Sequence, residues 1–363
     1  MRNPKNRVFV DIHVIQSLPP SCVNRDDTGS PKTAMYGGVR RARVSSQAWK
    51  HAMRELFKEY FSESELSERT KKIVEKVADQ IDLLGTFSKE DAIKKAEKII
   101  NQAGVSTKDL EAKALFFMSN KQAENLAHLA LMNPLPSKKE VQAALNAGKG
   151  IDIALFGRMV ADDPALNTDA SAQVAHAIST HKVENEYDYF TAMDDRSPED
   201  QAGAGMIGTV EFNSSTLYRY ATVAAHELEQ NLGDINATAK AIKEYIRAFV
   251  CSMPTGKLNT FANNTPPYAV MVAIRRDQPL SMAGAFETPI KAGEGGYQAK
   301  SAKALADYAS KMYDNFLSKP KDALITSVGD ELIGLGEALQ FIELLGKTEQ
   351  TVGGYLQEDG VDA

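Results

Sequence analysis

A run of basic residues near the amino terminus is the part of this sequence best suited to chemistry. Between Thr28 and Arg54 the chain has no acidic side chain and six cationic ones, namely Lys32, Arg40, Arg41, Arg43, Lys50 and Arg54. The formal charge of all 363 residues is −6, so the remainder of the chain carries −12. A solvated face is the alternative, but such a face normally mixes both signs. The stretch therefore favours a site for a polyanion.

The spacing inside this stretch strengthens the prediction. Ser45 or Ser46 can cap a helix on which Lys50 and Arg54 are four residues apart. Like charges at that spacing repel each other, and a bound phosphate chain would remove the repulsion and release counterions. The amides of Ser45, Ser46 and Gln47 would form a second anion site at the helix start. Gly37-Gly38 would also let the backbone approach a ligand closely.

Catalytic and metal-binding patterns are weaker. Asp26-Asp27, beside Arg25, could hold a divalent cation for phosphodiester hydrolysis. No third carboxylate is near in the sequence, so a turn whose carboxylates pair with Arg25 and cap amides is favoured. The six histidines, His176 and His181 among them, have no metal-binding spacing, and no Ser-His-Asp or Cys-His pattern is present. We therefore expect no catalytic residue, no metal and no cofactor.

Two further motifs have ordinary interpretations. The segment 203–208 reads GAGMIG and matches the dinucleotide fingerprint, but it lacks the strand before it and the helix after it that the fingerprint needs. A hairpin or loop tip is the better interpretation. Tyr189-Phe190, just before an acidic loop, could stack on bases, although aromatic residues at a strand end more often belong to a core.

Composition places the chain among ordinary globular proteins. It is 43% apolar and 25% charged, and its length suits about two domains. Cys22 and Cys251 are too few for a disulfide framework. No apolar run approaches a membrane span, and Asp11 interrupts the only signal-like segment. We expect a cytoplasmic protein with no membrane contact.

Hydrophobic periodicity predicts an α+β fold. Strands are expected at 8–15, 151–156, 174–183, 209–222 and 269–274, and helices at 46–60, 70–84, 88–103, 107–132, 137–147, after Asn236 and at 301–317. Ser88 with Asp91, and Ser137 with Glu140, are typical of capping boxes. Without the helical insertion at 62–149, the order is strand, helix, strands, helix, strand. That order fits a ferredoxin-like domain of the RNA-recognition type.

Several motifs together resemble the backbone-subunit family of the type I-E CRISPR Cascade complex (CasC, also called Cse4). The matching segments are SCVNRDD (21–27), KTA (32–34), GGVRRARVSSQ (37–47), Lys50, AMR (52–54), DIALFGRM (152–159), AHAI (175–178), DYFTA (188–192), FNSS (212–215), YRYA (218–221) and PLSMA (279–283). They run in order from about residue 8 to 290, and they are most specific in the first 54 residues.

The resemblance implies a modified RNA-recognition palm, a helical fingers insertion and a β-hairpin thumb. The palm would comprise residues 1–61, 150–188 and 216–363, the fingers 62–149 and the thumb hairpin 189–215, with the acidic loop 191–208 reaching toward a neighbouring subunit. Copies of such subunits form a helical filament along the CRISPR RNA, and the thumb displaces one guide base at regular intervals. The intervening guide segments pair with target DNA, so the expected role is a non-catalytic scaffold.

The resemblance also assigns residues and partners. The guide backbone would be gripped by Arg25, Lys32, Arg40, Arg41, Arg43, Ser45, Ser46, Gln47, Lys50 and Arg54. The displaced nucleotide would lie among Met159, Tyr189 and Phe190, where Tyr189 replaces a frequent Trp of the family. The expected partners are CRISPR RNA, target DNA, further copies of the chain, and the large, small, 5′-handle and CRISPR RNA endonuclease subunits. The alternative function is a metal-dependent ribonuclease acting on target RNA, since related subunits of other CRISPR types cut RNA.

Overall fold

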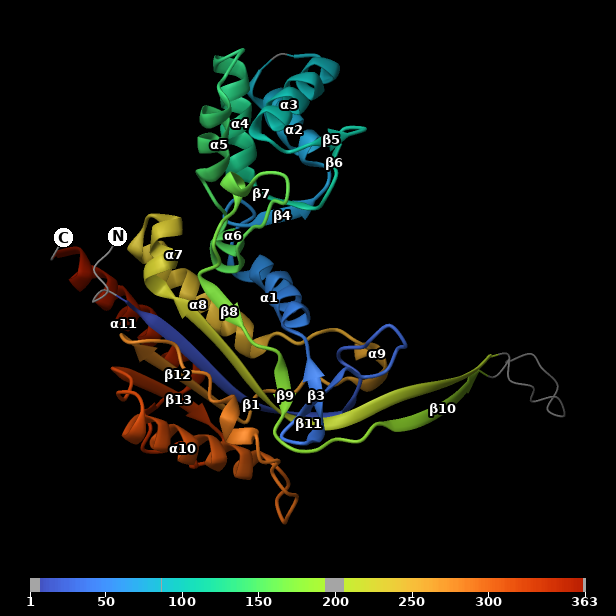
Figure 1. Ribbon diagram of the computed structural model, residues 1–363, viewed down its shortest axis with the longest axis vertical. Coiled ribbons are helices and arrows are strands. Elements are labelled where there is room, and N and C mark those ends of the chain that lie inside the picture. The colour runs from blue at the N-terminus through green and yellow to red at the C-terminus, as the bar shows by residue number, and fades with distance from the viewer. Residues whose placement is uncertain (1–6, 86, 193–205, 362–363) are drawn as a thin grey trace. The chain divides into compact units, whose positions relative to one another are not determined.

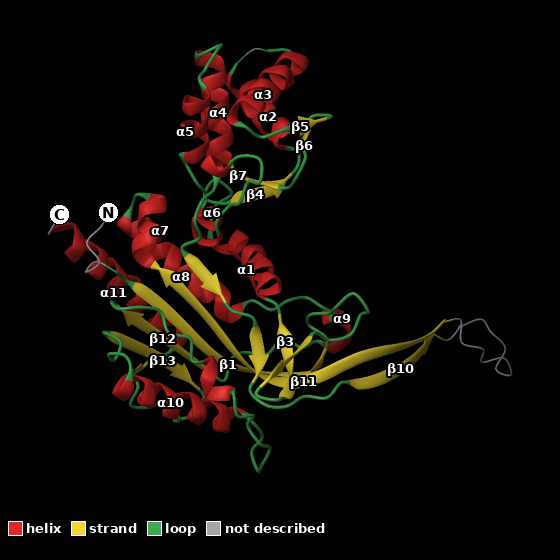
Figure 2. Ribbon diagram, in the orientation of Figure 1, coloured by secondary structure: helices red, strands yellow, loops and turns green. Residues whose placement is uncertain are grey.

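The computed structural model of the chain describes residues 7–85, 87–192 and 206–361 (Figures 1 and 2). The backbone forms two compact units. The first comprises Met1–Met53, Val174–Thr222 and Tyr245–Thr348, and the second comprises Arg54–Gln173, Val223–Glu244 and Glu349–Ala363. Within the described ranges, no helix combines the length and the apolar character needed to cross a bilayer.

One large sheet is the frame of the first unit. Its strands lie in the order β14, β13, β12, β1, β11, β9, β3 and β2, while β8 and β10 pair with β11 beside this path. The strands are β1 (Phe9–Ser21), β2 (Thr33–Tyr36), β3 (Val39–Val44), β8 (Ala172–Val174), β9 (Ala177–Ser179), β10 (Glu186–Ala192), β11 (Met206–Ala224), β12 (Ala269–Arg275), β13 (Asp322–Ser327) and β14 (Glu337–Ala338). The β1–β12, β9–β11, β3–β9 and β2–β3 pairs are antiparallel.

Four of these strands and two helices confirm the predicted fold class. Along the chain they follow β1, α1 (Ser46–Tyr60), β9, β11, α8 (Ile235–Cys251) and β12. In the sheet the strands lie in the order β12, β1, β11, β9. This is the β-α-β-β-α-β arrangement of ferredoxin-like domains, and the fold is α+β. The helical insertion lies in the sequence between α1 and β9, and β10 with β11 forms the hairpin (Figure 1).

The central strand β1 is buried on both faces, whereas its alternating pattern predicts a half-buried strand. Ile15 packs in a core with Leu305 of α10 (Gln298–Asn315), and Leu18 packs in a core with Trp49 of α1. The side chains that made the pattern look half polar are hydrogen-bonded inside the protein. Asp11 accepts from the Tyr220 hydroxyl at 2.8 Å. Tertiary contacts thus replace the water that alternation alone predicts for one face.

The second unit contains a bundle of four helices with its own hydrophobic core. These helices are α2 (Ile73–Leu84), α3 (Lys89–Ala103), α4 (Asn120–Met132) and α5 (Lys138–Asn146). The capping box of Ser137 with Glu140 is confirmed. Ser88 caps α3 by accepting from the Asp91 amide, but the reciprocal bond of a capping box is not formed there, because Asp91 accepts from the Ser88 hydroxyl instead. The smaller helices are α6 (Ile151–Phe156), α7 (Ala225–Leu232) and α9 (Leu258–Phe261).

Some predicted elements are wrong. The segment 107–119 forms strands β5 (Thr107–Lys108), β6 (Glu111–Ala112) and β7 (Phe116–Ser119) in place of a helix, and β7 pairs with β4 (Ser67–Thr70). Asp109 and Leu110 adopt positive φ angles of 52° and 64°, which interrupt a helix. The predicted strand 151–156 is helix α6. Asp234 rather than Asn236 caps α8 by accepting from the Ala237 amide. The long helix α11 (Phe341–Val361) was missed.

Asp11 predicts a pH dependence of stability. Burial raises the pKa of its carboxyl to about 6, although hydrogen bonds and Arg275 oppose the rise. A folded-state pKa above the unfolded value adds stability at low pH, and this stability is lost as the pH rises through 6. The test measures the unfolding free energies of wild type and Asp11→Asn by urea titration. We expect the difference, wild type minus Asp11→Asn, to be about 1 kcal/mol larger at pH 5 than at pH 7.5.

A second buried group makes this comparison between variants necessary. Burial lowers the pKa of His13 to about 3. Because His13 is harder to protonate in the folded state, the unfolding free energy of the protein falls as the pH drops below about 6.5. The two groups act in opposite directions, and His13 is present in both proteins. A difference between wild type and Asp11→Asn that stays constant with pH would contradict the assigned shift.

Candidate nucleic-acid interface

Asn24 joins the loop before β2 to the start of α1. Its backbone carbonyl accepts from the Lys32 amide at 2.9 Å, and its side-chain oxygen accepts from the Ser45 amide at 2.9 Å. The Lys32 carbonyl in turn accepts from the Arg43 amide of β3 at 2.9 Å. These bonds place the loop, the β2–β3 hairpin and the first turn of α1 beside one another in the first unit.

Inside this loop, Asp26 acts as a turn acceptor. Its Oδ1 accepts from the Thr28 amide at 3.0 Å, the Thr28 hydroxyl at 2.7 Å and the Ser30 amide at 3.1 Å. The Thr28 hydroxyl makes the largest contribution to lowering the pKa of Asp26. This geometry favours the turn over the cation site. Across the described residues, no group of three metal-ligating side chains could hold an ion.

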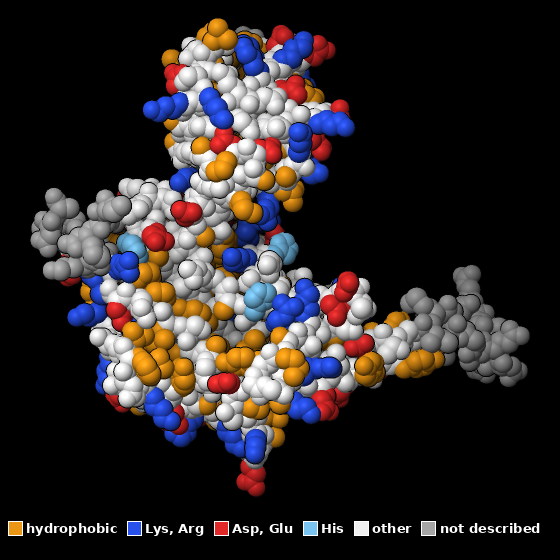
Figure 3. All heavy atoms as spheres, in the orientation of Figure 1, with side chains coloured by type: hydrophobic (Ala, Val, Ile, Leu, Met, Phe, Trp, Pro, Cys, Tyr) orange, Lys and Arg blue, Asp and Glu red, His pale blue; other side chains and the backbone are white. Residues whose placement is uncertain are grey.

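The cations of this region lack carboxylate partners. Arg25 and Arg40 are exposed, and Lys32 and Arg43 are half-buried. None of the four lies within 4.0 Å of a carboxylate oxygen in the described part of the chain. Figure 3 shows Lys and Arg side chains gathered beside a histidine over the area of β3 and β9. The surface therefore carries positive charge that the protein itself does not neutralise.

Two of these cations line one very small hollow, which is too small to hold a nucleotide. Its polar lining is Ser21, Asn24, Lys32, Arg43, Asn213 and Ser215. Arg43 also contacts His176, whose Nδ1 lies 3.2 Å from a guanidinium nitrogen. Burial lowers the pKa of His176, and the charges of Arg43 and Lys32 lower it further. Amide, hydroxyl and cationic groups of this kind can bind the phosphates and sugars of a nucleic acid.

Arg41 has a structural role that the sequence did not reveal. It is fully buried and donates to the carbonyls of Tyr36 at 3.1 Å, Ser179 at 3.0 Å, Phe286 at 2.8 Å and Glu287 at 3.2 Å. The expectation that Arg41 grips phosphate is wrong, because its guanidinium is enclosed and makes four hydrogen bonds to these carbonyls. Arg41 instead fastens the β2–β3 hairpin to the segment after β12.

The glycines at the tip of this hairpin also have a structural explanation. Gly37 and Gly38 have φ angles of +57° and +76°, which suit a two-residue hairpin turn. A Cβ on Gly37 would lie 1.7 Å from the carbonyl oxygen of Glu287, the same oxygen that Arg41 contacts. The close approach of the protein's own backbone therefore explains why position 37 is a glycine, and no ligand is needed for this explanation.

The helix start keeps part of its predicted anion site. Ser45 is the cap, since its Oγ accepts from the Ala48 amide at 3.2 Å, and its own amide is already bonded to Asn24. The amides of Ser46 and Gln47 donate to no acceptor among the described residues. The half-buried Lys50 lies one turn further on, and burial lowers its pKa. Two open amides remain as candidate anion contacts at the helix start.

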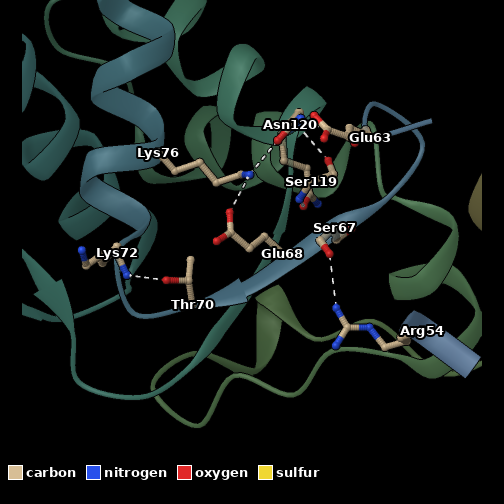
Figure 4. A network of polar contacts seen from close by, with 10 residues as sticks. Arg54, Glu63, Ser67, Glu68, Thr70, Lys72, Lys76, Ser119 and Asn120 are labelled. Atoms are coloured by element: carbon tan, nitrogen blue, oxygen red, sulfur yellow. Dashed lines mark hydrogen bonds and ion pairs between the residues drawn. The ribbon is translucent and has the colours of Figure 1, made fainter. Parts of the chain in front are cut away.

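Arg54 is held by its own unit, the second one. Its Nε lies 3.3 Å from Oδ2 of Asp152, a second nitrogen donates to the Ser67 carbonyl at 3.3 Å, and the guanidinium lies 4.5 Å from the Phe117 ring centre. Figure 4 shows Arg54 pointing toward Ser67, near the Lys76–Glu68 pair. Burial raises the pKa of Asp152, and the charge of Arg54 opposes that rise. Arg54 thus already neutralises a buried carboxylate, unlike Arg25, Lys32, Arg40 and Arg43.

The hairpin of β10 and β11 separates the two aromatic residues predicted to stack. Tyr189 pairs with Thr209 and Phe190 pairs with Gly208, so the two rings lie on opposite faces of the ribbon. A Cβ on Gly208 would lie 2.4 Å from the Phe190 ring, which therefore covers this glycine. That contact explains the last glycine of the 203–208 motif. Residues 203–205 of the motif and most of the acidic loop 191–208 lie outside the described ranges.

Met159 belongs to the second unit, where its side chain is 86% exposed.

The residues that sequence reasoning missed are Asn24 and His176, because a positioning amide and an arginine partner leave no spacing pattern. Both lie inside segments of the family resemblance, which was the only signal for them.

Comparisons with known proteins relate the chain to one family and to two solved structures. The chain matches the model of the CT1975-like protein family over residues 10–345. A solved chain titled "CRISPR RNA-guided surveillance complex, pre-nicking" is 32% identical with a TM-score of 0.83, and the match covers 95% of this chain and 100% of that one. Another, titled "CRISPR RNA-guided surveillance complex", is 27% identical with a TM-score of 0.72 and coverages of 94% and 99%. No curated protein matches the chain.

The contrast between Arg40 and Arg41 predicts a difference in stability. Arg41→Ala leaves four carbonyls without their donor and opens a buried space, so we expect a loss of about 3 kcal/mol in unfolding free energy. Arg40→Ala removes an exposed side chain from the same strand and should change that free energy by less than about 0.5 kcal/mol. Urea denaturation of RNA-free protein measures both. Equal unfolding of the two variants would contradict the assigned role of Arg41.

Proposed function

The chain belongs to the CT1975-like protein family, and from this membership we propose that it is an RNA-binding subunit of a CRISPR RNA-guided surveillance complex. The observation that carries the proposal is the group of Arg25, Lys32, Arg40 and Arg43, whose charges lack carboxylate partners among the described residues of a chain with net charge −6. The titles of the two similar solved structures support the same assignment.

A ribose-phosphate chain fits the chemistry of this surface. Guanidinium groups bind phosphate oxygens through paired hydrogen bonds, and open amides at a helix start bind them through the helix dipole. Association with phosphate would relieve the repulsion among the clustered cations and release counterions. Side chains of this kind fix the position of a nucleic acid without reading its sequence. Sequence selection would then come from base pairing between guide and target.

In its finer form, the proposal is a type I-E backbone subunit. Copies would line up along the guide RNA beside the other Cascade subunits, and the guide would pair with target DNA. Arg25, Lys32, Arg40 and Arg43 would grip the guide, with the amides of Ser46 and Gln47 and the ammonium of Lys50 beside them. The hairpin of β10 and β11, with Phe190 and Tyr189, would displace a guide base, and Met159 would support that base. The chain would supply no catalytic group.

The double substitution Lys32→Glu and Arg43→Glu tests the surface, because these residues share one hollow. We expect affinity for single-stranded RNA at about 0.15 M salt to fall at least about tenfold. The slope of log affinity against log salt should fall by about 0.7 for each phosphate that the protein no longer neutralises. Filter binding over a salt series measures both quantities.

The matched control is Lys319→Glu with Lys321→Glu, which changes the net charge equally at two exposed positions of the first unit. The control should bind RNA with nearly wild-type affinity and slope. Equal losses in the two double variants would mean that net charge, rather than this surface, governs binding.

The non-catalytic assignment has its own test. The Asp26 carboxylate is used by three donors of its own turn, so we expect no cleavage of target RNA in the presence of Mg²⁺ or Mn²⁺. Denaturing gels of labelled RNA after incubation measure this. Cleavage by wild type that disappears in Asp26→Ala or Asp27→Ala would instead establish the ribonuclease.

A further inference from the structure

A groove in the second unit combines an apolar lining with negative charge. It has a volume of about 350 Å³ and is bordered by α2, α3 and the β5–β6 hairpin, which lie beside one another in Figure 1. Volumes of about 300 to 1,000 Å³ are typical of ligand sites. The apolar part of the lining is Val74, Ala78, Ala92, Ile93 and Leu110. The charged part is Glu75, Asp79, Asp82, Asp109 and Glu111, with Lys72 and Lys89.

The β5–β6 hairpin is fastened to the two helices that it borders. The Ala112 amide of β6 donates to the carbonyl of Lys71, just before α2, at 2.8 Å. The Asn101 side-chain amide of α3 donates to the Thr107 hydroxyl of β5 at 2.8 Å. These bonds hold the border of the groove in place, so the groove is formed before any partner binds.

Leu110, at the tip of this hairpin, has an unusual backbone conformation. Its φ angle is 64°, next to Asp109 at 52°. Two-residue turns of this kind favour Asn and Gly, because larger side chains are disfavoured at positive φ. Leu110 nevertheless lines the groove, and its side chain is 43% exposed. Leu83, which is 77% exposed, lies one helical turn beyond Asp79 and extends the apolar area.

The carboxylates of the groove are largely without counter-ions. Glu75 pairs with Lys72 at 3.6 Å. Like charges repel one another along α2, where acidic residues of the lining are spaced three and four residues apart. A cationic ligand would relieve this repulsion, whereas a phosphate chain would increase it. Within the part of the chain that the structure describes, the carboxylates more than 4.0 Å from every Lys, Arg and His nitrogen are those of Asp79, Asp82, Asp109 and Glu111.

Apolar surface and negative charge together define the class of partner. Across the described residues, no three metal-ligating side chains converge on one point. A polyamine would satisfy the charges but would leave Ile93 and Leu110 without an apolar contact. A peptide that carries an aliphatic side chain between Lys or Arg residues satisfies both, and a pattern of this kind is typical of protein interfaces.

We propose that this groove docks a basic peptide segment of a partner protein. An aliphatic side chain of the peptide packs against Ile93 and Leu110, and its flanking Lys or Arg residues lie beside Asp79 and Asp82. The inference goes beyond the proposed RNA-binding function and does not depend on it. It gives the second unit a protein partner of opposite charge to the partner of the basic surface.

Fluorescence anisotropy of the full chain with labelled hexapeptides tests the proposal. The probes KKLLKK, KLKLKK and KLKKLK place two Leu residues at different spacings among Lys residues. We expect at least one probe to bind about tenfold or more tightly than its counterpart with Ser in place of Leu, because the Ser peptide buries no aliphatic side chain. Counterparts with Glu in place of Lys should not bind, and added salt should weaken the binding of the Lys probes.

Variants of the chain locate the binding. Asp79→Asn with Asp82→Asn should weaken binding of the best probe about fivefold or more. The matched control is Asp169→Asn with Glu227→Gln, which removes two carboxylates from exposed positions of the same unit outside the groove and should bind as wild type does. Leu110→Gly should also weaken binding, while the melting temperature should not fall, because glycine is unstrained at this φ angle.

Three results would overturn the docking site. One is equal binding of the Leu and Ser peptides by wild type. Another is an equal loss of binding in the groove variant Asp79→Asn with Asp82→Asn and in its matched control, which would mean that net charge governs binding. The third is self-association of wild type in sedimentation that the groove variant loses, with no peptide binding by either protein, which would make the groove a contact between copies of this chain.

Discussion

Clustered cations that repel one another occupy the β2–β3 hairpin and the loop before it, beside the start of α1. Hydrogen bonds through Asn24 hold Lys32 and Arg43 near the start of α1, and no carboxylate of the described chain neutralises them. The fold maintains an arrangement that is unfavourable on its own and becomes favourable when a polyanion is bound. The rest of the chain is acidic, which limits non-specific attraction of nucleic acid to other surfaces.

Burial sorts the basic residues of the same short stretch into different roles. Arg41 donates to four carbonyls and fixes the hairpin, Arg54 pairs with a buried carboxylate, and Arg40 remains open to solvent. All three lie between Thr28 and Arg54, a stretch without acidic residues, so composition alone treats them alike. What separates them is the set of acceptors that distant parts of the chain bring near. A charge cluster read from sequence therefore overstates the size of the binding surface.

Local signals predicted much of the fold, and long-range contacts decided the rest. The strand expected at 8–15 forms, although it is buried on both faces. One of the two candidate caps, Ser45, starts α1, and the capping box at Ser137 forms as expected, because a cap depends on neighbours within a few residues. The burial of Arg41 depends on Ser179 and Phe286, which no local pattern reveals. Helix α11 was missed because Gly346, Gly353 and Gly354 weaken its helical propensity. Its helicity is set by tertiary structure.

Nucleic acid that stays bound through purification would show that these cations hold RNA. The chain, expressed with a CRISPR RNA and purified at low salt, should show an absorbance ratio at 260 and 280 nm well above that of protein alone. Ribonuclease should remove the excess, and deoxyribonuclease should not. A preparation with the absorbance ratio of pure protein, obtained while that RNA is abundant in the same cells, would contradict a surface whose positive charge is neutralised by RNA.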